Sequence, residues 1–150
     1  MKWTPLHNKY EGDLENDLLL FDLAKKALEP EGQTIIHCTY VSKRKYVNGG
    51  WVNINKNTFL VNPDTKDMLT MVDPTKKDML YMVQAFNVPV SPGRHVFTRA
   101  GQLKRFTLLF PQVPKHWKRF HLLEIADPEN GFRITDIVRN DTGVYHIELT

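Results

Sequence analysis

Short hydrophobic runs alternate with closely spaced turn residues along most of the chain. Runs rich in β-branched and aromatic residues, which predict strands, occupy 34–41, 51–54, 58–61, 68–72, 79–86, 106–110, 120–125, 132–138 and 144–149. Within 106–110, Phe106, Leu108 and Phe110 fall on one face, as in a strand with one buried side. Gly, Pro, Asn and Asp separate the runs and leave little room for helices. This pattern predicts an all-β, antiparallel β-sandwich of about eight or nine short strands.

The segment 13–28 fits two structures. It contains good helix formers, and Asp13 or Asn16 would cap a short N-terminal helix. Its central part, 18–23, is an almost continuous hydrophobic run of the kind that also forms a strand buried on both faces. Both interpretations stay open on the residues alone. The length of 150 residues predicts a single domain over 1–150, with 1–16 as a candidate N-terminal extension.

Composition narrows the class of protein. With 41% hydrophobic and 25% charged residues, the chain is typical of globular proteins and unlike disordered ones. No run of about 20 apolar residues is present, so we expect no membrane span. The single cysteine, Cys38, excludes an internal disulfide, and we expect it on the core side of its strand with Ile36. No export signal follows Met1, which predicts a cytoplasmic protein as written, or a periplasmic or exported one if a signal was removed.

Residues that carry catalysis or bind metals form no motif in this sequence. His37 and Cys38 are neighbours on a predicted strand, so they point to opposite faces and do not share a metal ion. His116 and His121 are five residues apart across a loop–strand junction. Metalloprotease, zinc-cage, nucleophile-elbow and phosphate-loop spacings are all missing. We therefore expect no catalytic residues, no metal site, no cofactor and no enzyme activity.

Charge is concentrated in the middle of the chain. The segment 79–123 contains seven Lys and Arg residues and no Asp or Glu, although the net charge of the whole chain is only +3. Within it, a basic loop follows two prolines and consists of Lys115, His116, Trp117, Lys118 and Arg119. An aromatic ring among cations can stack on a nucleic-acid base while the cations meet phosphates. The alternative, which we favour, is that Trp117 is buried over the end of the sandwich and the cations keep the loop solvated. We expect the flanking strands, 106–110 and 120–125, to pair with each other.

From about residue 34 to 137 the chain resembles an immunoglobulin-like β-sandwich domain of Bacteroidetes-type bacteria, one without an assigned activity that often accompanies exported thioredoxin-like domains. The resemblance rests on core and turn motifs, which in this sequence read TIIH at 34–37, GWVNI at 50–54, TFL at 58–60, HVF at 95–97, FTLLFP at 106–111, VP at 113–114, FHLLE at 120–124 and GFRI at 131–134, together with Pro89, Gly101 and Ile137. It implies the fold and no site residues. It also favours a strand within 18–25, because a strand usually precedes the one at 34–41 in that pattern.

These observations predict a non-enzymatic accessory or protein-interaction module whose partner is another protein. The alternative is a binder of polyanions or single-stranded nucleic acid through the segment 79–123, with the basic loop as the binding residues. In either case we expect the largest side chains of the core to be Trp51, Phe59, Phe97, Phe106, Phe110, Phe120 and Phe132.

Overall fold

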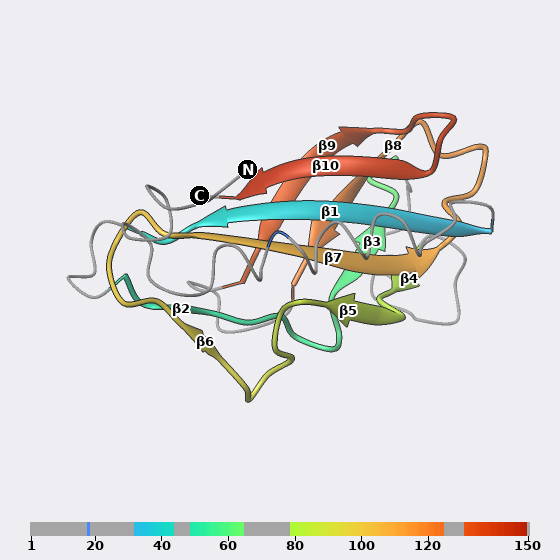
Figure 1. Cartoon of the computed structure of the whole chain (residues 1–150). Coiled ribbons are helices and arrows are strands. Elements are labelled where there is room, and N and C mark those ends of the chain that lie inside the picture. Colours follow the sequence, from blue (N-terminus) through green and yellow to red (C-terminus); the bar gives the residue numbers. More distant parts are fainter. Residues whose placement is uncertain (1–17, 19–31, 44–48, 65–78, 125–130, 150) are drawn as a thin grey trace.

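The computed structural model describes residues 18, 32–43, 49–64, 79–124 and 131–149 (Figure 1). The described residues form ten strands: β1 (Gln33–Val41), β2 (Trp51–Val52), β3 (Phe59–Val61), β4 (Met79–Tyr81), β5 (Gln84–Phe86), β6 (His95–Val96), β7 (Leu103–Pro111), β8 (Arg119–Leu123), β9 (Arg133–Val138) and β10 (Val144–Leu149). The predicted all-β class is confirmed for this part of the chain. The segment 68–72 and the segment 13–28, apart from Leu18, lie outside the described residues.

The strands form two four-stranded sheets and a two-stranded one. The first sheet has the order β10-β1-β7-β5, the second has the order β4-β3-β8-β9, and β2 pairs with β6. Every strand pair within these sheets is antiparallel except β1 with β10, so the expectation of a purely antiparallel fold is wrong at that edge. A parallel pair needs a long connection, and almost the whole described chain lies between these two strands.

The two four-stranded sheets lie one behind the other and share one core (Figure 1). Alternate residues of β7 (Phe106, Leu108 and Phe110) enter this core, as the alternation predicts. Phe120 and Leu122 of β8 enter it from the other sheet. Of the aromatic residues expected in the core, Phe59, Phe97, Phe106, Phe110 and Phe120 are buried, Phe132 is half-buried and Trp51 is exposed. The size of a side chain therefore does not decide its burial: Trp51 of β2 is exposed, whereas its smaller neighbour Val52 is buried.

Cys38 lies on the core face of β1 together with Ile36 and Tyr40, which confirms the predicted orientation of this strand. Burial raises the pKa of the Cys38 thiol far above its ordinary value. The neighbouring residue, His37, faces the opposite side, where its Nδ1 lies 2.8 Å from the hydroxyl of Thr107. A thiol that is buried and protonated in this way is a packing residue and a poor nucleophile.

Two predicted strand arrangements are wrong. The run 79–86 is not one strand, because the Met82 N–H donates to the Thr58 carbonyl beside the second sheet while the Val83 N–H donates to the Leu109 carbonyl of the first. The chain thus crosses from the second sheet to the first between Met82 and Val83. Strands β7 and β8 do not pair either: β7 lies between β1 and β5, and β8 lies between β3 and β9. Their proline-containing connection crosses from one sheet to the other instead of forming a hairpin.

Candidate functional site

The basic loop crosses the end of the core between β7 and β8, and its tryptophan fills the space beneath it. Trp117 is 1% exposed and belongs to the same core cluster as Phe110 and Phe120. Its backbone N–H donates to the Pro114 carbonyl at 3.0 Å, which closes a turn after the second proline. The indole Nε1 is buried without a hydrogen-bond partner among the described residues. The predicted burial of Trp117 is confirmed, so its ring offers no face on which a base could stack.

Arg119, at the other end of the loop, is held by two carboxylates. Its guanidinium donates to Asp64 at 3.0 Å and to Asp136 at 2.6 Å, and all three side chains are partly exposed. The hydrogen bond and charge of Asp64, then those of Asp136, raise the pKa of Arg119 above its ordinary value. Asp136 belongs to β9, so its contact ties the end of the loop to the C-terminal part of the chain. Arg119 is therefore occupied within the protein.

Lys115, His116 and Lys118 are the exposed members of the basic loop. The Lys118 carbonyl accepts the backbone N–H of Arg139 at 3.1 Å, which places the loop beside the chain that leaves β9. Within the described residues, the loop offers two exposed lysines and an exposed histidine, but neither an exposed aromatic ring nor an unpaired arginine.

The other cations of the segment 79–123 do not gather with this loop. Arg94 precedes β6 and Arg99 follows it, whereas the basic loop follows the far end of β7, on the opposite side of the molecule (Figure 1). Lys104 is buried on β7, where its Nζ lies 3.4 Å from Asn87 Oδ1. A cluster of charge in the sequence is therefore distributed over both ends of the fold.

Two of the exposed large hydrophobic residues lie opposite each other on the two-stranded sheet. Trp51 of β2 is 42% exposed, and Val96, its partner on β6, is 62% exposed. The expectation that Trp51 is a core residue is wrong, because Val52 (2% exposed) and Ile54 (1% exposed) take the inward positions of this segment. A strand presents alternate residues to opposite faces, so Trp51 must point outward with Asn53.

A cation covers part of the exposed ring. The guanidinium carbon of Arg94 lies 4.8 Å from the centre of the Trp51 ring. Arg94 is itself exposed and lies two positions before Val96, so the strand period places both side chains on the outer side. Asn53 Nδ2 donates to the Gly93 carbonyl at 2.8 Å, which fixes the chain just before Arg94. This arrangement, here called the Trp51 face, consists of Trp51, Arg94 and Val96.

The Trp51 face could have been found from the sequence by applying the strand period to its polar residue. In the segment 51–54, the hydrophobic Val52 and Ile54 share one parity, and Trp51 shares the other with the polar Asn53. An asparagine seldom lies in a hydrophobic core. The parity of Asn53 therefore indicates the solvent side for Trp51, a signal outweighed by the usual preference of large aromatic residues for the core.

No catalytic arrangement is evident in the described part of the chain. Glu124 is a buried carboxylate, which is a property of many catalytic acids. Its two oxygens, however, accept hydrogen bonds from the backbone N–H groups of Asn55 at 2.6 Å and Phe132 at 3.0 Å. Burial raises the pKa of Glu124, and the two hydrogen bonds oppose that effect. These contacts join the chain after β2 to the sheet of β8 and β9, which is a structural role. Among the same described residues, no three His, Cys, Asp or Glu side chains lie close enough to hold a metal ion.

Comparison with known protein families, with curated proteins and with solved structures found no match to this chain. Within the described ranges, no helix has the length and hydrophobicity that a bilayer span requires.

Proposed function

We propose that this chain is a non-enzymatic accessory module that binds another protein, with an immunoglobulin-like arrangement of its sheets. Support for the arrangement comes from two four-stranded sheets around one core and from connections, such as β7 to β8, that pass between the sheets. The parallel pair β1–β10 and the added two-stranded sheet are features for which the resemblance gave no expectation.

The observation that carries the binding role is the Trp51 face. Trp and Arg are the residue types most enriched among side chains that dominate protein–protein binding energy. Here the Arg94 guanidinium is already stacked on the Trp51 ring, so less side-chain freedom is lost when a partner binds. Val96 extends the hydrophobic area next to the ring. A partner that fits this face presents a hydrophobic side chain to Trp51 and Val96 and a carboxylate to Arg94.

Affinity capture with matched variants tests this role. Wild-type protein, the double variant Trp51→Ser with Val96→Ser, and the control Val138→Ser are immobilised and exposed to extract of the source cells. Val138 is also an exposed valine, but it lies on β9, outside the Trp51 face. We expect a protein retained by the wild type and the control to be lost with the double variant, and its binding to be reproduced with purified partner. Equal retention by all three proteins, or retention of nothing, contradicts the proposal.

Binding of a polyanion through the basic loop is the alternative, supported by the exposure of Lys115, His116 and Lys118. It lacks the stacking surface that single-stranded nucleic acid prefers, because Trp117 is buried. Wild-type protein and Lys115→Ala/Lys118→Ala can be compared for binding of single-stranded DNA at low salt. Binding that weakens steeply with salt and is lost in the double variant would favour this alternative over the Trp51 face.

A further inference from the structure

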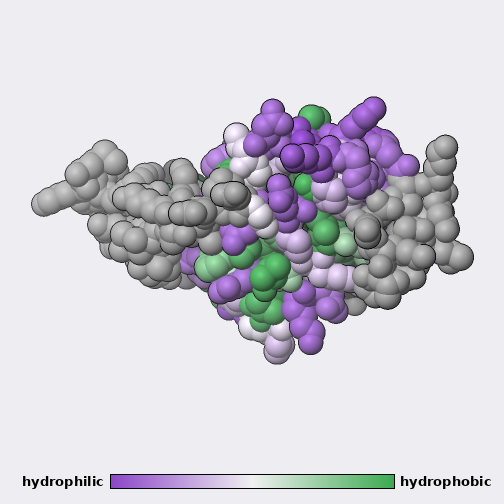
Figure 2. All heavy atoms as spheres, turned by 90° about the vertical axis from the view of Figure 1, so that its right-hand side faces the viewer, coloured by the Kyte–Doolittle hydropathy of each residue, from purple (hydrophilic) through white to green (hydrophobic). Residues whose placement is uncertain are grey.

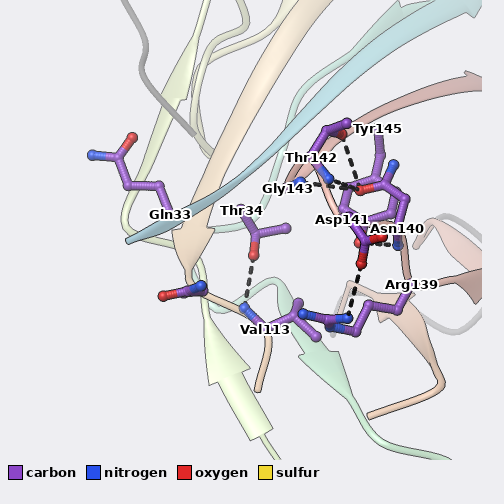
Figure 3. Close-up of a pocket in the computed structure, with 10 residues that line it drawn as sticks. Gln33, Thr34, Val113, Arg139, Asn140, Asp141, Thr142, Gly143 and Tyr145 are labelled. Carbon is purple, nitrogen blue, oxygen red and sulfur yellow. Dashed lines mark hydrogen bonds and ion pairs between the residues drawn. The ribbon is translucent and has the colours of Figure 1, made fainter. Parts of the chain in front are cut away.

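A polar cavity opens at the end of the fold where β1 begins, β7 ends and the β9–β10 loop turns back. Its volume is about 320 Å³, at the lower end of the range for small-molecule sites. Figure 3 shows Thr34, Val113, Arg139 and Asp141 around its centre. Figure 2 views the molecule from this end, and hydrophilic residues dominate its upper part. Most of the lining side chains are polar, whereas Val113 and Tyr145 also belong to the sandwich core.

One wall of the cavity is held in place by internal hydrogen bonds. The Oδ1 atom of Asn140 accepts the backbone N–H groups of Thr142 at 3.1 Å and Gly143 at 3.0 Å. The backbone N–H of Asn140 donates to the Tyr145 hydroxyl at 3.0 Å, and the Gly143 carbonyl accepts the N–H of Ile35 at 2.8 Å. These contacts tie the β9–β10 loop to β1 and β10, so the cavity does not depend on free side chains for its shape.

Two hydroxyl groups that line the cavity have a proton to donate to a ligand. The hydroxyls of Thr34 and Tyr145 each accept a backbone N–H, from Val113 at 2.9 Å and from Asn140, so each hydroxyl keeps its own proton to donate. The oxygen of the Asn140 side chain is already used within the loop. These two hydroxyls suit a ligand that accepts hydrogen bonds, and Gln33 Oε1, buried without a partner among the described residues, adds one acceptor to the same lining.

Arg139 supplies the charge. Its side chain is 21% exposed, and the contact recorded for its guanidinium is Asp141, with Nη1 3.8 Å from Oδ1. That distance is too long for a hydrogen bond. The Asp141 side chain is fully exposed, so water screens the attraction. The planar guanidinium in the cavity therefore retains donors for a planar, two-oxygen acceptor, which is the geometry that arginine recognises best.

We propose that this cavity is a binding site for a monocarboxylate, with Arg139 donating to both carboxylate oxygens and the hydroxyls of Thr34 and Tyr145 assisting. Arg139 supplies one positive charge and the Asp141 carboxylate lies beside it, so a singly charged ligand matches this lining better than a doubly charged one. The exposed Lys115 and Lys118 lie on the neighbouring loop and would attract anions towards this end. The carboxylate belongs either to a small free acid or to the C-terminus of a peptide.

An NMR titration of the backbone amide signals of the cavity residues Thr142 and Gly143, and in the wild type also of the Arg139 Nε–H signal, with acetate, propionate and inorganic phosphate in turn, tests the site. A tripeptide with a free C-terminus and the same peptide with an amidated C-terminus distinguish the two sources of the carboxylate. We expect saturable shifts with carboxylates and weaker effects with phosphate. Arg139→Gln should weaken carboxylate binding by at least about tenfold, and Asp141→Asn should strengthen it. Arg133→Gln, an exposed arginine of β9 outside the cavity, should leave it unchanged.

Three results would overturn the site. One is the absence of saturable shifts at millimolar carboxylate with the total salt held constant. Another is equal binding by Arg139→Gln and wild type. The third is phosphate binding more tightly than acetate, which would refute the single-charge argument. The amide spectrum of Arg139→Gln shows directly whether the variant is folded, and Asp141→Asn provides an independent reading because its expected effect is a gain.

Discussion

The basic loop and the Trp51 face each contain a tryptophan and an arginine, but the two regions use them in opposite ways. In the loop, Trp117 is buried in the core and Arg119 is held by Asp64 and Asp136. On the Trp51 face, the ring is 42% exposed and Arg94 stacks on it. In the loop, which stands out in the sequence by its charge, the aromatic residue and the arginine both stabilise the fold. The two-stranded sheet leaves both available at the surface.

The cause of this difference is the position of each tryptophan relative to the core. The connection between β7 and β8 crosses an open end of two packed sheets, and a large indole removes that hydrophobic end from water. Strand β2 already contributes Val52 to the core, so the two-residue period directs Trp51 outward. The residue types of a cluster therefore predict its chemistry only once the inward positions around it are known.

The largest effect is expected when the buried indole of Trp117 is removed. Trp117→Ala should lower the free energy of unfolding by about 3–5 kcal/mol, because it deletes a fully buried aromatic side chain and leaves a cavity. Trp117→Phe should cost much less, since it keeps most of the hydrophobic volume and removes the unpartnered indole N–H. Urea denaturation of the three proteins provides the measurement. A loss below about 1 kcal/mol for Trp117→Ala would mean that the loop does not close the core.

Replacement of Gly49 tests how closely the chain before Trp51 packs against the chain after β6. The φ of Gly49 is +81°, and a Cβ there would collide with the backbone carbonyl of Arg99 and approach the Phe97 Cβ to 2.8 Å. Gly101 has a similar φ of +85° but open space around it, so it is the matched control. Both alanine variants incur the cost of the left-handed backbone, and Gly49→Ala should be less stable than Gly101→Ala by a further 1–3 kcal/mol, roughly. Equal thermal and urea midpoints would show that the chain does not approach Arg99 this closely.

Glu124 joins the chain after β2 to the second sheet, so its replacement tests the same attachment from the other side. Glu124→Gln replaces one carboxylate oxygen by an amide NH₂ group, which cannot accept the hydrogen bond that one of the two backbone N–H groups donates. The substitution should therefore lower the free energy of unfolding by about 1–3 kcal/mol at neutral pH.

The pH dependence has a defined sign. Burial raises the pKa of folded Glu124 above its ordinary value of 4.5, so between these two pKa values the folded state holds a proton that the unfolded state has lost. The Glu124 contribution therefore favours folding below this window and is lost as pH rises through the folded pKa. Between pH 4 and the folded pKa, the free energy of unfolding of the wild type should lose the Glu124 contribution as pH rises, and that of Glu124→Gln should not show this loss. The same pH profile for both proteins would contradict the assignment.

The smallest effect is expected from the exposed tryptophan. Trp51→Ala should change the free energy of unfolding by about 1 kcal/mol or less, because much of the ring is already in water. Val52→Ala, the adjacent and smaller residue, should cost more because Val52 is 2% exposed. The reverse order, measured by urea denaturation, would place Trp51 in the core and remove the basis of the proposed binding face.

Much of the fold could be predicted because it depends on local pattern. The alternation in 106–110 and in 34–41 gave the correct inward faces of β7 and β1, including that of Cys38. The sheet to which each strand belongs could not be read in this way. Strands β7 and β8 are close in sequence, yet the crossing of their connection is decided by how two whole sheets pack.

The surfaces were harder to predict than the strands, for a physical reason. Charge along a sequence does not record direction, so the seven cations of 79–123 gave no sign that Arg94 and Lys118 lie at different ends of the molecule. The carboxylates that hold Arg119 come from residues 55 and 17 positions away. Such partners become visible only when the chain has folded. For Trp51, by contrast, the parity of Asn53 was a local signal that would have been sufficient.

Residue-by-residue oxidation of the tryptophans tests the central claim most directly. Native protein is treated with a tryptophan-selective oxidant, and the peptides that contain Trp51 and Trp117 are quantified by mass spectrometry, with urea-unfolded protein as the reference. The structure predicts rapid oxidation of Trp51 in the native state and oxidation of Trp117 only on unfolding. Native oxidation of Trp117 at a rate equal to or above that of Trp51 would contradict the account.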